Sequence, residues 1–366
     1  MSVAACGGSD DDGSTEGLPQ TVTLDTVMDL SGPAGLAGNS VRDGFQFAID
    51  EINETDFLDG TELELRAEDT QTNREQAVSL VTQAAKGDSP VIFGPVASSV
   101  TLAVAPIAQR EGVPYVATQS HTAGVVEIGD YIFRLTPPQS TYQDKMAKYL
   151  KSKDVGTVGL IYLEEGASNA EWGRKLMPQE LEDEGIDVVE SGSVMSSEGD
   201  FASLATRLIK KHPDAIGISV SGTQNSTIVG QLRQQGYDGL IFGDLGFAGG
   251  TLEGAGAAAD GVVYTTNFSA DLETASSKKF IDAWTKTHDG KEPSNFNAEG
   301  YDAMWFVARA IKEAGSVDRD EVRDAMESVA KGGLEGAQGQ LAFDGRDART
   351  DGLIVEWRDG GVHQVS

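Results

Sequence analysis

Val91-Ile-Phe-Gly-Pro-Val-Ala-Ser-Ser-Val-Thr101 is the stretch that decides the fold class of this chain. The apolar run 91–93 is typical of a buried parallel strand, and the Gly-Pro pair that follows ends it. Ser98 or Ser99 is placed to cap a helix that begins near Thr101. A strand, a glycine turn and a helix start aim N–H groups and hydroxyls at an anion, but any helix prefers a serine cap. The segment therefore predicts either an anion-binding turn or a plain cap.

The same strand-and-helix unit repeats on both sides of this segment. Strands are expected at 21–28, 63–69, 91–93 and 113–117. Asn39 is expected to cap the first helix, Asn73 to start the second, and the third begins near Thr101. Short connections between alternating strands and helices predict a parallel sheet with right-handed crossovers. Ligand sites in such sheets lie at the carboxyl ends of the strands. Three polar, small-residue loops are expected there, at 29–38, 94–99 and 118–122.

A second series of similar size follows. Its strands are expected at 155–162, 188–194, 215–221 and 240–242, and polar residues again follow the strand ends. A further strand at 262–265, helices at 275–288, 296–314 and 319–328, and short strands at 341–343 and 353–357 complete the chain. We therefore predict an α/β protein with two doubly wound parallel-sheet lobes.

The composition excludes several classes of partner. The chain has 366 residues, 39% of them hydrophobic, and no apolar run long enough to cross a bilayer. With 28 Lys+Arg against 58 Asp+Glu, the formal charge of −30 repels nucleic acid and anionic membranes. We therefore expect no nucleic-acid partner and no membrane contact through the protein surface.

The single cysteine stands in an informative setting. Val3-Ala-Ala-Cys6-Gly matches the small-residue end of a bacterial lipoprotein signal, and a polar, acidic tether follows it. A stray cysteine in a tail is the alternative. Lipidation at Cys6 predicts an extracytoplasmic protein anchored to the cell membrane by its lipid alone.

The sequence offers little for catalysis. It has no Gly-x-Ser-x-Gly elbow, and its four histidines lack the spacing of a transition-metal site. We expect no enzyme activity, no metal and no cofactor.

Several motifs carry a resemblance to a known family. They are Met28-Asp-Leu-Ser-Gly-Pro-Ala, Phe93-Gly-Pro-Val-Ala-Ser-Ser-Val-Thr101 and Glu299-Gly-Tyr-Asp-Ala-Met. In this order and spacing the chain resembles the type I solute-binding proteins of ABC importers, over about residues 20–365. It is most similar to the branched-chain amino-acid binding group, which also includes amide and aromatic-acid binders.

The resemblance implies two lobes joined by three crossings, near 136–139, 264–267 and 343–350, with a hinge motion that closes on a ligand. It implies a tether at 1–19, a first lobe at 20–137 plus 267–345, and a second lobe at 138–266 plus 346–366. The implied partners are a small ligand and the permease subunits of an ABC importer, with the protein itself a monomer. A domain of the same fold that senses a ligand for signalling is the alternative.

The resemblance also implies a set of ligand-binding residues. On the first lobe these are Ser98, Ser99, Gln119, Ser120 and His121, which would hold a carboxylate or amide. The second lobe and the wall would add Trp172, Ser221, Asp244 and Phe296. Each has a structural alternative, because an aromatic residue is often core and a loop serine or histidine often stabilises only its own turn.

Three positions depart from the leucine-binding pattern. Small residues stand around Ala37 in place of an aromatic, and Trp172 stands where tyrosine is commoner. The carboxylate that pairs with a ligand ammonium falls at Leu245, with Asp244 one residue earlier. The ligand class therefore stays open among amino acids, amides, keto acids and aromatic acids.

Overall fold

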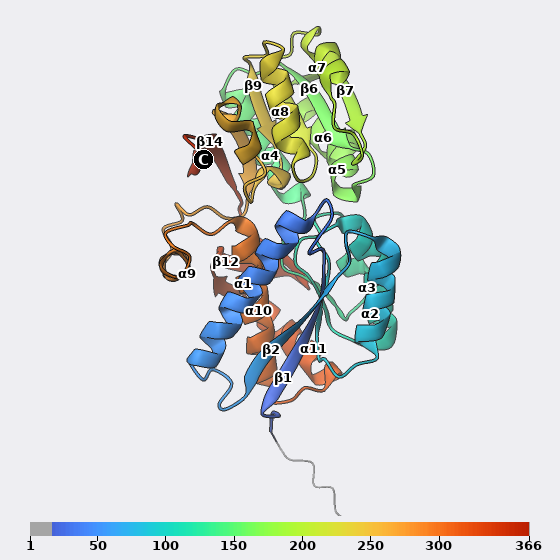
Figure 1. Ribbon diagram of the computed structural model, residues 1–366, viewed down its shortest axis with the longest axis vertical. Coiled ribbons are helices and arrows are strands. Elements are labelled where there is room, and N and C mark those ends of the chain that lie inside the picture. Colours follow the sequence, from blue (N-terminus) through green and yellow to red (C-terminus); the bar gives the residue numbers. More distant parts are fainter. Residues whose placement is uncertain (1–16, 366) are drawn as a thin grey trace, which may run out of the picture.

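The computed structural model of the chain describes residues 17–365, so Cys6 lies outside the described residues. Figure 1 shows two α/β lobes stacked along the long axis of the molecule. Among the described residues, the first lobe is built on a sheet of eight strands and the second on a sheet of seven. This arrangement confirms the expected fold of two doubly wound lobes.

The first lobe contains the sheet with the order β11-β12-β13-β5-β4-β3-β1-β2. Its strands are β1 (Thr21–Met28), β2 (Glu62–Asp69), β3 (Ile92–Phe93), β4 (Tyr115–Ala117), β5 (Ile132–Arg134), β11 (Leu334–Gly336), β12 (Gly339–Asp344) and β13 (Asp347–Arg349). Its helices are α1 (Gly35–Glu54), α2 (Arg74–Ala85), α3 (Ser98–Glu111), the 3₁₀ turn η1 (Val126–Ile128), α9 (Ala275–Thr287), α10 (Asn295–Ala314) and α11 (Arg319–Gly332).

The second lobe contains the sheet with the order β15-β14-β10-β9-β8-β6-β7. Its strands are β6 (Thr157–Leu163), β7 (Asp187–Val194), β8 (Ala215–Ser219), β9 (Leu240–Gly243), β10 (Val262–Thr266), β14 (Leu353–Arg358) and β15 (Gly361–Gln364). Its helical segments are α4 (Ser140–Ser152), α5 (Ala167–Glu171), the π-helical turn η2 (Trp172–Leu176), α6 (Met177–Asp183), α7 (Ala202–Ile209), α8 (Gln224–Gln234), and the 3₁₀ segments η3 (Leu245–Phe247) and η4 (Glu253–Ala259).

The parallel parts of the two sheets have the same topology. In the first lobe the order is β2-β1-β3-β4-β5, and in the second it is β7-β6-β8-β9-β10. In each sheet the strand order reverses between the first and third strands of the unit. Ligand crevices in open α/β sheets form at this reversal, outside the carboxyl ends of the strands.

The chain passes between the sheets after β5, after β10 and after β13. The expected boundaries of the two lobes, at residues 137, 266 and 345, stay a prediction. The strand pairings differ from them at one point, because β13 begins two residues beyond the expected limit of the first lobe at 345. It pairs there with β12 and, through Asp347 and Arg134, with β5 in the first sheet.

Helix α3 does not begin as expected from the sequence. It starts at Ser98 with Ala97 as the N-cap residue, and no side chain of the cap residue accepts a bond there. Instead the Asp29 carboxylate, 67 and 68 residues earlier in the chain, accepts the N–H groups of Val96 and Ala97 at 3.0 and 3.1 Å. The prediction that Ser98 or Ser99 caps a helix beginning near Thr101 was wrong, because both serines already belong to the first turn of α3, and Asp29 holds the loop just before it.

Helix α10 is held against α1 by close backbone contact. A Cβ added at Gly44 would lie 2.2 Å from the carbonyl oxygen of Asn297, and one at Gly300 would lie 2.3 Å from that of Val41. Only glycine permits this approach, since no real Cβ sits that close to an oxygen. The contact fixes α10, and with it the buried side chain of Glu299, behind the crossings.

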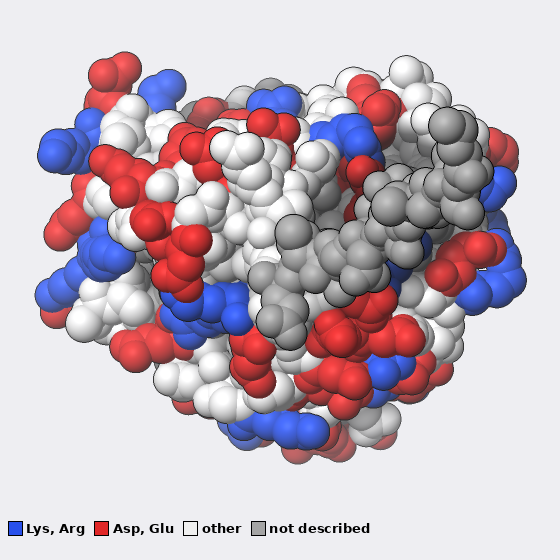
Figure 2. All heavy atoms as spheres, turned by 90° about the horizontal axis from the view of Figure 1, so that it is seen from below, with Lys and Arg blue, Asp and Glu red and all other residues white. Residues whose placement is uncertain are grey.

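The surface reflects the acidic composition. On the face shown in Figure 2, Asp and Glu side chains form patches that alternate with single Lys and Arg groups. Among the helices of the described residues, none combines the length and apolar character that a bilayer crossing requires.

Candidate functional site

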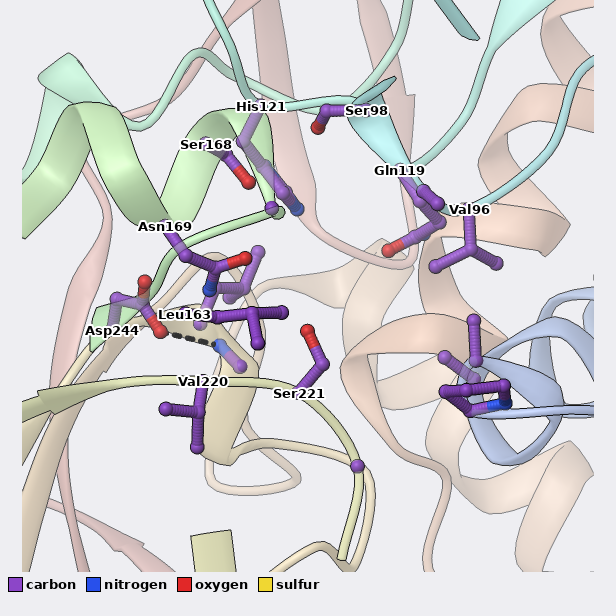
Figure 3. Close-up of a pocket in the computed structure, with 18 of the residues that line it drawn as sticks. Val96, Ser98, Gln119, His121, Leu163, Ser168, Asn169, Val220, Ser221 and Asp244 are labelled. Carbon is purple, nitrogen blue, oxygen red and sulfur yellow. Dashed lines mark hydrogen bonds between the residues drawn. The ribbon is translucent and has the colours of Figure 1, made fainter. Parts of the chain in front are cut away.

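A cavity of about 510 Å³ lies between the two lobes. The first lobe lines it with residues that follow β1, β3 and β4, and the second with residues that follow β6, β8 and β9. Figure 3 shows Gln119 and His121 on one side, facing Val220, Ser221 and Asp244 on the other. The carboxyl ends of both sheets therefore meet at this cavity.

The start of α3 forms one part of the first-lobe wall. Ser98 is 6% exposed and Ser99 is exposed, and both line the cavity. Asp29 already takes the two preceding N–H groups, and burial raises the pKa of this carboxyl. The N–H groups of Ser98 and Ser99 follow in the first helical turn, where no intrahelical acceptor exists. This wall therefore offers hydroxyl and N–H donors.

The loop after β4 forms the second part of that wall. Gln119 is 2% exposed and donates its amide N–H to Glu299, while its Oε1 has no partner among the described residues. The Nδ1 of His121 lies 3.2 Å from the hydroxyl of Thr136 and 3.3 Å from the carbonyl oxygen of Pro137. The carbonyl can only accept, and the Thr136 hydroxyl donates to Glu299, so Nδ1 carries the proton. Burial lowers the pKa of His121 to about 4, so the ring is neutral.

This tautomer alters the expected role of His121. The resemblance implied that His121 helps to hold a ligand carboxylate or amide, but its one N–H is directed at Pro137 and Thr136. The other ring nitrogen of a neutral imidazole is an acceptor. His121 therefore presents an acceptor to the cavity that it lines.

Asp244 is the central group of the second-lobe wall. It is 3% exposed and caps the turn η3, accepting the N–H of Gly246 at 2.9 Å. Its other oxygen accepts from the hydroxyl of Ser219 and the amide of Gln139. Burial raises the pKa of Asp244 to about 6, and these hydrogen bonds partly offset the rise. The half-buried side chain of Ser221 lines the same wall.

Phe296 was expected either to contact the ligand or to pack in the core, and its position fits both. It is 6% exposed and belongs to the first-lobe core, and it also lines the cavity. The structure therefore brings seven of the nine expected residues to one cavity: Ser98, Ser99, Gln119, His121, Ser221, Asp244 and Phe296.

Trp172 and Ser120 do not reach the cavity. Trp172 is fully buried in the second-lobe core, where its indole N–H donates to Gln143 at 2.8 Å and its ring centroid lies 6.1 Å from that of Phe242. The helical stretch begins at Ala167, so Trp172 follows a full helical turn, at the start of η2. Ser120 is fully buried, and its carbonyl accepts from Arg134 at 3.3 Å.

The sequence analysis missed other residues that line the cavity, among them Gln139, Tyr142, Gln143 and Asn169. Gln139 stands in the first crossing, which was itself expected. Glu299 was also missed as a second-layer group, although a carboxylate three residues after Phe296, on the buried side of a helix, is an unusual pattern.

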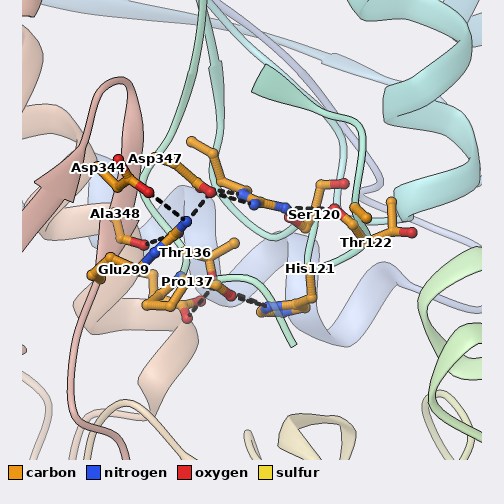
Figure 4. Close-up of polar contacts among 12 residues, drawn as sticks. Ser120, His121, Thr122, Thr136, Pro137, Glu299, Asp344, Asp347 and Ala348 are labelled. Carbon is orange, nitrogen blue, oxygen red and sulfur yellow. Dashed lines mark hydrogen bonds and ion pairs between the residues drawn. The ribbon is translucent and has the colours of Figure 1, made fainter. Parts of the chain in front are cut away.

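A buried ion pair joins two of the crossings. The guanidinium of Arg134 pairs with Asp347 through contacts of 2.6 and 2.7 Å, and donates to the carbonyl oxygen of Thr122 at 2.5 Å (Figure 4). Asp347 also pairs with Arg349 at 2.6 Å. Arg134 ends the strand before the first crossing, and Asp347 precedes the third. The pair therefore ties the start of the first crossing to the strand that leads into the third.

The two lobes also touch directly at two places beside the cavity. Glu171 of the second lobe accepts from the hydroxyl of Thr122 at 3.1 Å and from the N–H of Ala123 at 3.3 Å. On the other side, a Cβ at Gly222 would lie 2.9 Å from the carbonyl oxygen of Pro33. The cavity is therefore enclosed by contacts between the lobes as well as by the crossings.

Comparison with known proteins adds a family and its ligands. The model of the periplasmic binding protein family matches residues 21–361. The leucine-, isoleucine-, valine-, threonine-, and alanine-binding protein of Pseudomonas aeruginosa is 25% identical over 348 residues, which cover 92% of this chain and 90% of that protein.

Two solved structures are similar over nearly the whole chain. The branched-chain amino acid transporter substrate binding protein LivJ of Streptococcus pneumoniae, in complex with isoleucine, has a TM-score of 0.85 at 26% identity and covers 94% of this chain and 99% of its own. A solute binding protein of an ABC transporter from R. palustris, in complex with benzoate, has a TM-score of 0.84 at 16% identity, covering 94% and 96%. This second likeness concerns the fold alone.

Proposed function

This chain belongs to the periplasmic binding protein family, and we propose that it captures a small amino-acid-like, carboxylate or amide ligand in the interlobe cavity and delivers it to the permease of an ABC importer. The family is extracytoplasmic, and binding rather than chemistry is its role. The observation that carries the proposal is the cavity of about 510 Å³, which polar strand-end groups of both lobes line together.

The first lobe would hold the acidic end of the ligand. Ser98 and Ser99 offer two hydroxyls and the first N–H groups of α3, which favour an anion. The second lobe would hold the other end, where Ser221 and Asp244 face the first lobe across the cavity. Phe296 would pack on the apolar part of the ligand.

A thermal-shift screen tests the proposal. A ligand that binds only the native state raises the free energy of unfolding by about 2.7 kcal/mol at a hundredfold excess over its Kd. The panel should contain the proteinogenic L-amino acids, small aliphatic amides, branched keto acids and aromatic acids including benzoate. We expect at least one class to raise the Tm in a concentration-dependent way, and a panel without any stabilising compound would overturn the proposal.

Ser98→Ala locates the binding site. A hydrogen bond to a charged group contributes about 1.5–3 kcal/mol, so we expect the Kd of the stabilising ligand to rise about tenfold to hundredfold by calorimetric titration. Ser276→Ala is the matched control, because Ser276 lies in the first turn of α9 and does not line the cavity. Equal affinities of the two variants would remove Ser98 from the site.

We also propose lipidation at Cys6, which would keep the protein at the outer face of the membrane. In cells fed an alkyne fatty acid, wild type should acquire the label and sediment with membranes, whereas Cys6→Ser should do neither. Labelling of the Cys6→Ser variant would contradict the assignment.

A further inference from the structure

Glu299 stands behind the cavity and is surrounded by donors. It is fully buried on α10 and does not itself line the cavity. One carboxylate oxygen accepts from the hydroxyl of Thr136 at 3.1 Å and from the amide of Asn267. The other oxygen accepts only from the amide of Gln119, which does line the cavity.

The oxygen that accepts from Thr136 and Asn267 cannot take a proton without the loss of hydrogen bonds. Asn267 also donates from the same nitrogen to Gln338 at 2.7 Å. The amide of Gln338 is oriented in turn, because its N–H donates to Asp302 at 3.0 Å. Reversing Asn267 would therefore break a chain of hydrogen bonds that Asp302 fixes.

The second oxygen has a partner that can reverse. The Oε1 of Gln119 has no partner among the described residues, so turning the amide by half a turn loses no internal hydrogen bond. A protonated Glu299 would donate to that Oε1, and the amide N–H₂ of Gln119 would then face the cavity. When Glu299 is ionised, it holds the N–H₂ and Oε1 faces the cavity, the orientation that Figure 3 shows.

We propose that Glu299 is a positioning residue for the ligand site, and that its protonation state decides whether Gln119 presents a hydrogen-bond donor or an acceptor to the ligand. The proposal rests on the interlobe cavity being the ligand site, as proposed above. It assigns a specificity-determining role to a side chain that never touches the ligand.

The surroundings of Glu299 determine which state holds near neutral pH. Burial raises the pKa of Glu299 to about 8, although hydrogen bonds from Asn267, Gln119 and Thr136 lower it, and the charge of Asp302 on the same helix adds to the rise. Tyr142 from α4 is a neutral neighbour, and His121 is neutral as well. The cations Arg134 and Arg349 are both paired with Asp347. At pH 7 Glu299 is therefore mostly protonated, and Gln119 then presents its N–H₂ by turning its amide half a turn from the orientation that the structure shows, in which the amide N–H donates to Glu299.

The second-lobe wall contains a similar glutamine–carboxyl pair, Gln139 and Asp244, in which the carboxyl group is ionised at neutral pH. Gln139 donates its amide to Asp244, and its own Oε1 lacks a partner among the described residues. Because burial raises the pKa of Asp244 only to about 6, this carboxyl is ionised at neutral pH and Gln139 presents an oxygen. Tyr142, Glu165 and His121 are the other titratable side chains that line the cavity.

The two walls thus differ in polarity between about pH 6 and about pH 8. The first lobe offers donors from Gln119 and Ser98, and the second offers acceptors from Gln139 and Asp244. This pattern fits a ligand with a carboxylate at one end and an ammonium or amide N–H at the other. Above about pH 8 the Gln119 oxygen would face the ligand carboxylate and weaken binding.

Nuclear magnetic resonance of the ligand-free protein tests the switch directly. The side-chain N–H₂ resonances of Gln119, assigned with Gln119→Ala, should shift with a midpoint near the value for Glu299, about 8. In Glu299→Gln the shift should vanish, because the new amide donates to Gln119 at every pH. A Gln119 signal that does not titrate, or that titrates equally in Glu299→Gln, would overturn the proposal whether or not any ligand binds.

Binding of L-leucine and isocaproate gives the second readout. Isocaproate lacks the amine, so its charge is constant over this range. We expect both to bind wild type about tenfold more weakly at about pH 9 than at about pH 7, because the binding-competent form then holds one more proton. Glu299→Gln should bind equally at both pH values. A fall that persists in Glu299→Gln refutes the switch, whereas failure of both compounds at every pH counts against the proposed ligand class alone, since the resonance titration decides the switch.

Discussion

Gly222→Ala tests whether ligand binding requires the lobe contact seen beside the cavity. Gly222 has φ +60°, and a Cβ there would meet one atom within 4 Å, the Pro33 carbonyl oxygen of the other lobe at 2.9 Å. Alanine in the left-handed conformation costs about 1–2 kcal/mol of stability wherever it is placed. The contact with Pro33 adds crowding only when the lobes are together.

The matched control lies at the other end of the same helix. Gly236 has φ +83° just after α8, and a Cβ there meets nothing within 4 Å. Gly236→Ala therefore carries the same kind of backbone cost without the contact between lobes. Because Gly222 also lines the cavity, a difference between the two variants measures the crowding at Pro33 together with any contact of the new methyl group with the ligand.

Overpacking of a close contact costs about 1–3 kcal/mol, which corresponds to a loss of affinity of about 5- to 150-fold. We expect thermal unfolding to show both variants destabilised to a similar extent. Calorimetric titration with the stabilising ligand should show weaker binding in Gly222→Ala alone. If Gly222→Ala binds as tightly as Gly236→Ala, the bound form does not bring Gly222 to Pro33 and the reasoning fails.

Three further substitutions probe the contacts around the cavity. Glu171→Gln should weaken ligand binding by about 1 kcal/mol in calorimetry with little change in Tm, because it replaces the charged acceptor of Thr122 by a neutral one; unchanged affinity would show that this contact is not needed for closure. Arg134→Met should lower the free energy of unfolding in urea by about 3 kcal/mol, the low end for a broken buried pair, since Arg349 still pairs with Asp347; a loss below about 1 kcal/mol would mean that Arg349 alone satisfies Asp347. Glu299→Gln should gain stability over wild type as pH rises from 4.5 to about 8, because the native state keeps a proton that the unfolded chain releases; parallel stability curves would contradict the raised pKa.

The positions of the strands and their polar ends followed from the sequence because they depend on local pattern. Strand β1 begins and ends at the expected residues, and helix α2 starts as expected at Asn73, whose side chain caps it by accepting the N–H of Gln76 at 2.9 Å. Asn39 was wrongly expected to cap α1, because that helix already begins at Gly35. The topology followed from the alternation of strands and helices. Parallel strand ends then had to meet at one edge, which is why seven expected residues share one cavity.

The errors have a common physical origin in contacts between distant segments. The loop before α3 is held by Asp29, and no local pattern near Ser98 reveals this contact. The partners of Glu299 come from three separate segments, at Gln119, Thr136 and Asn267. Trp172 was misplaced because a five-residue helical turn precedes it. Second-layer groups such as Glu299 are therefore the part of a site that sequence periodicity conceals.

The charges around the cavity bear on the ligand that remains open. No Lys or Arg lines it among the described residues, His121 is neutral, and Glu165 and Asp244 are acidic. The whole chain has a formal charge of −30, so the long-range field also repels anions.

These charges favour some ligand classes over others. A ligand whose only charged group is a carboxylate would enter this field with only neutral donors to hold it. A zwitterion or a neutral amide would avoid that cost, because in the proposed site its N–H groups would meet Asp244 and the oxygen of Gln139 while Ser98 would hold the other end. Since Asp244 shares its oxygens with three internal donors, this end of the ligand would be held by a shared carboxylate rather than a dedicated one. We therefore expect compounds that keep the N–H donor but lose the full ammonium charge, such as primary amides, to compete with amino acids for this cavity.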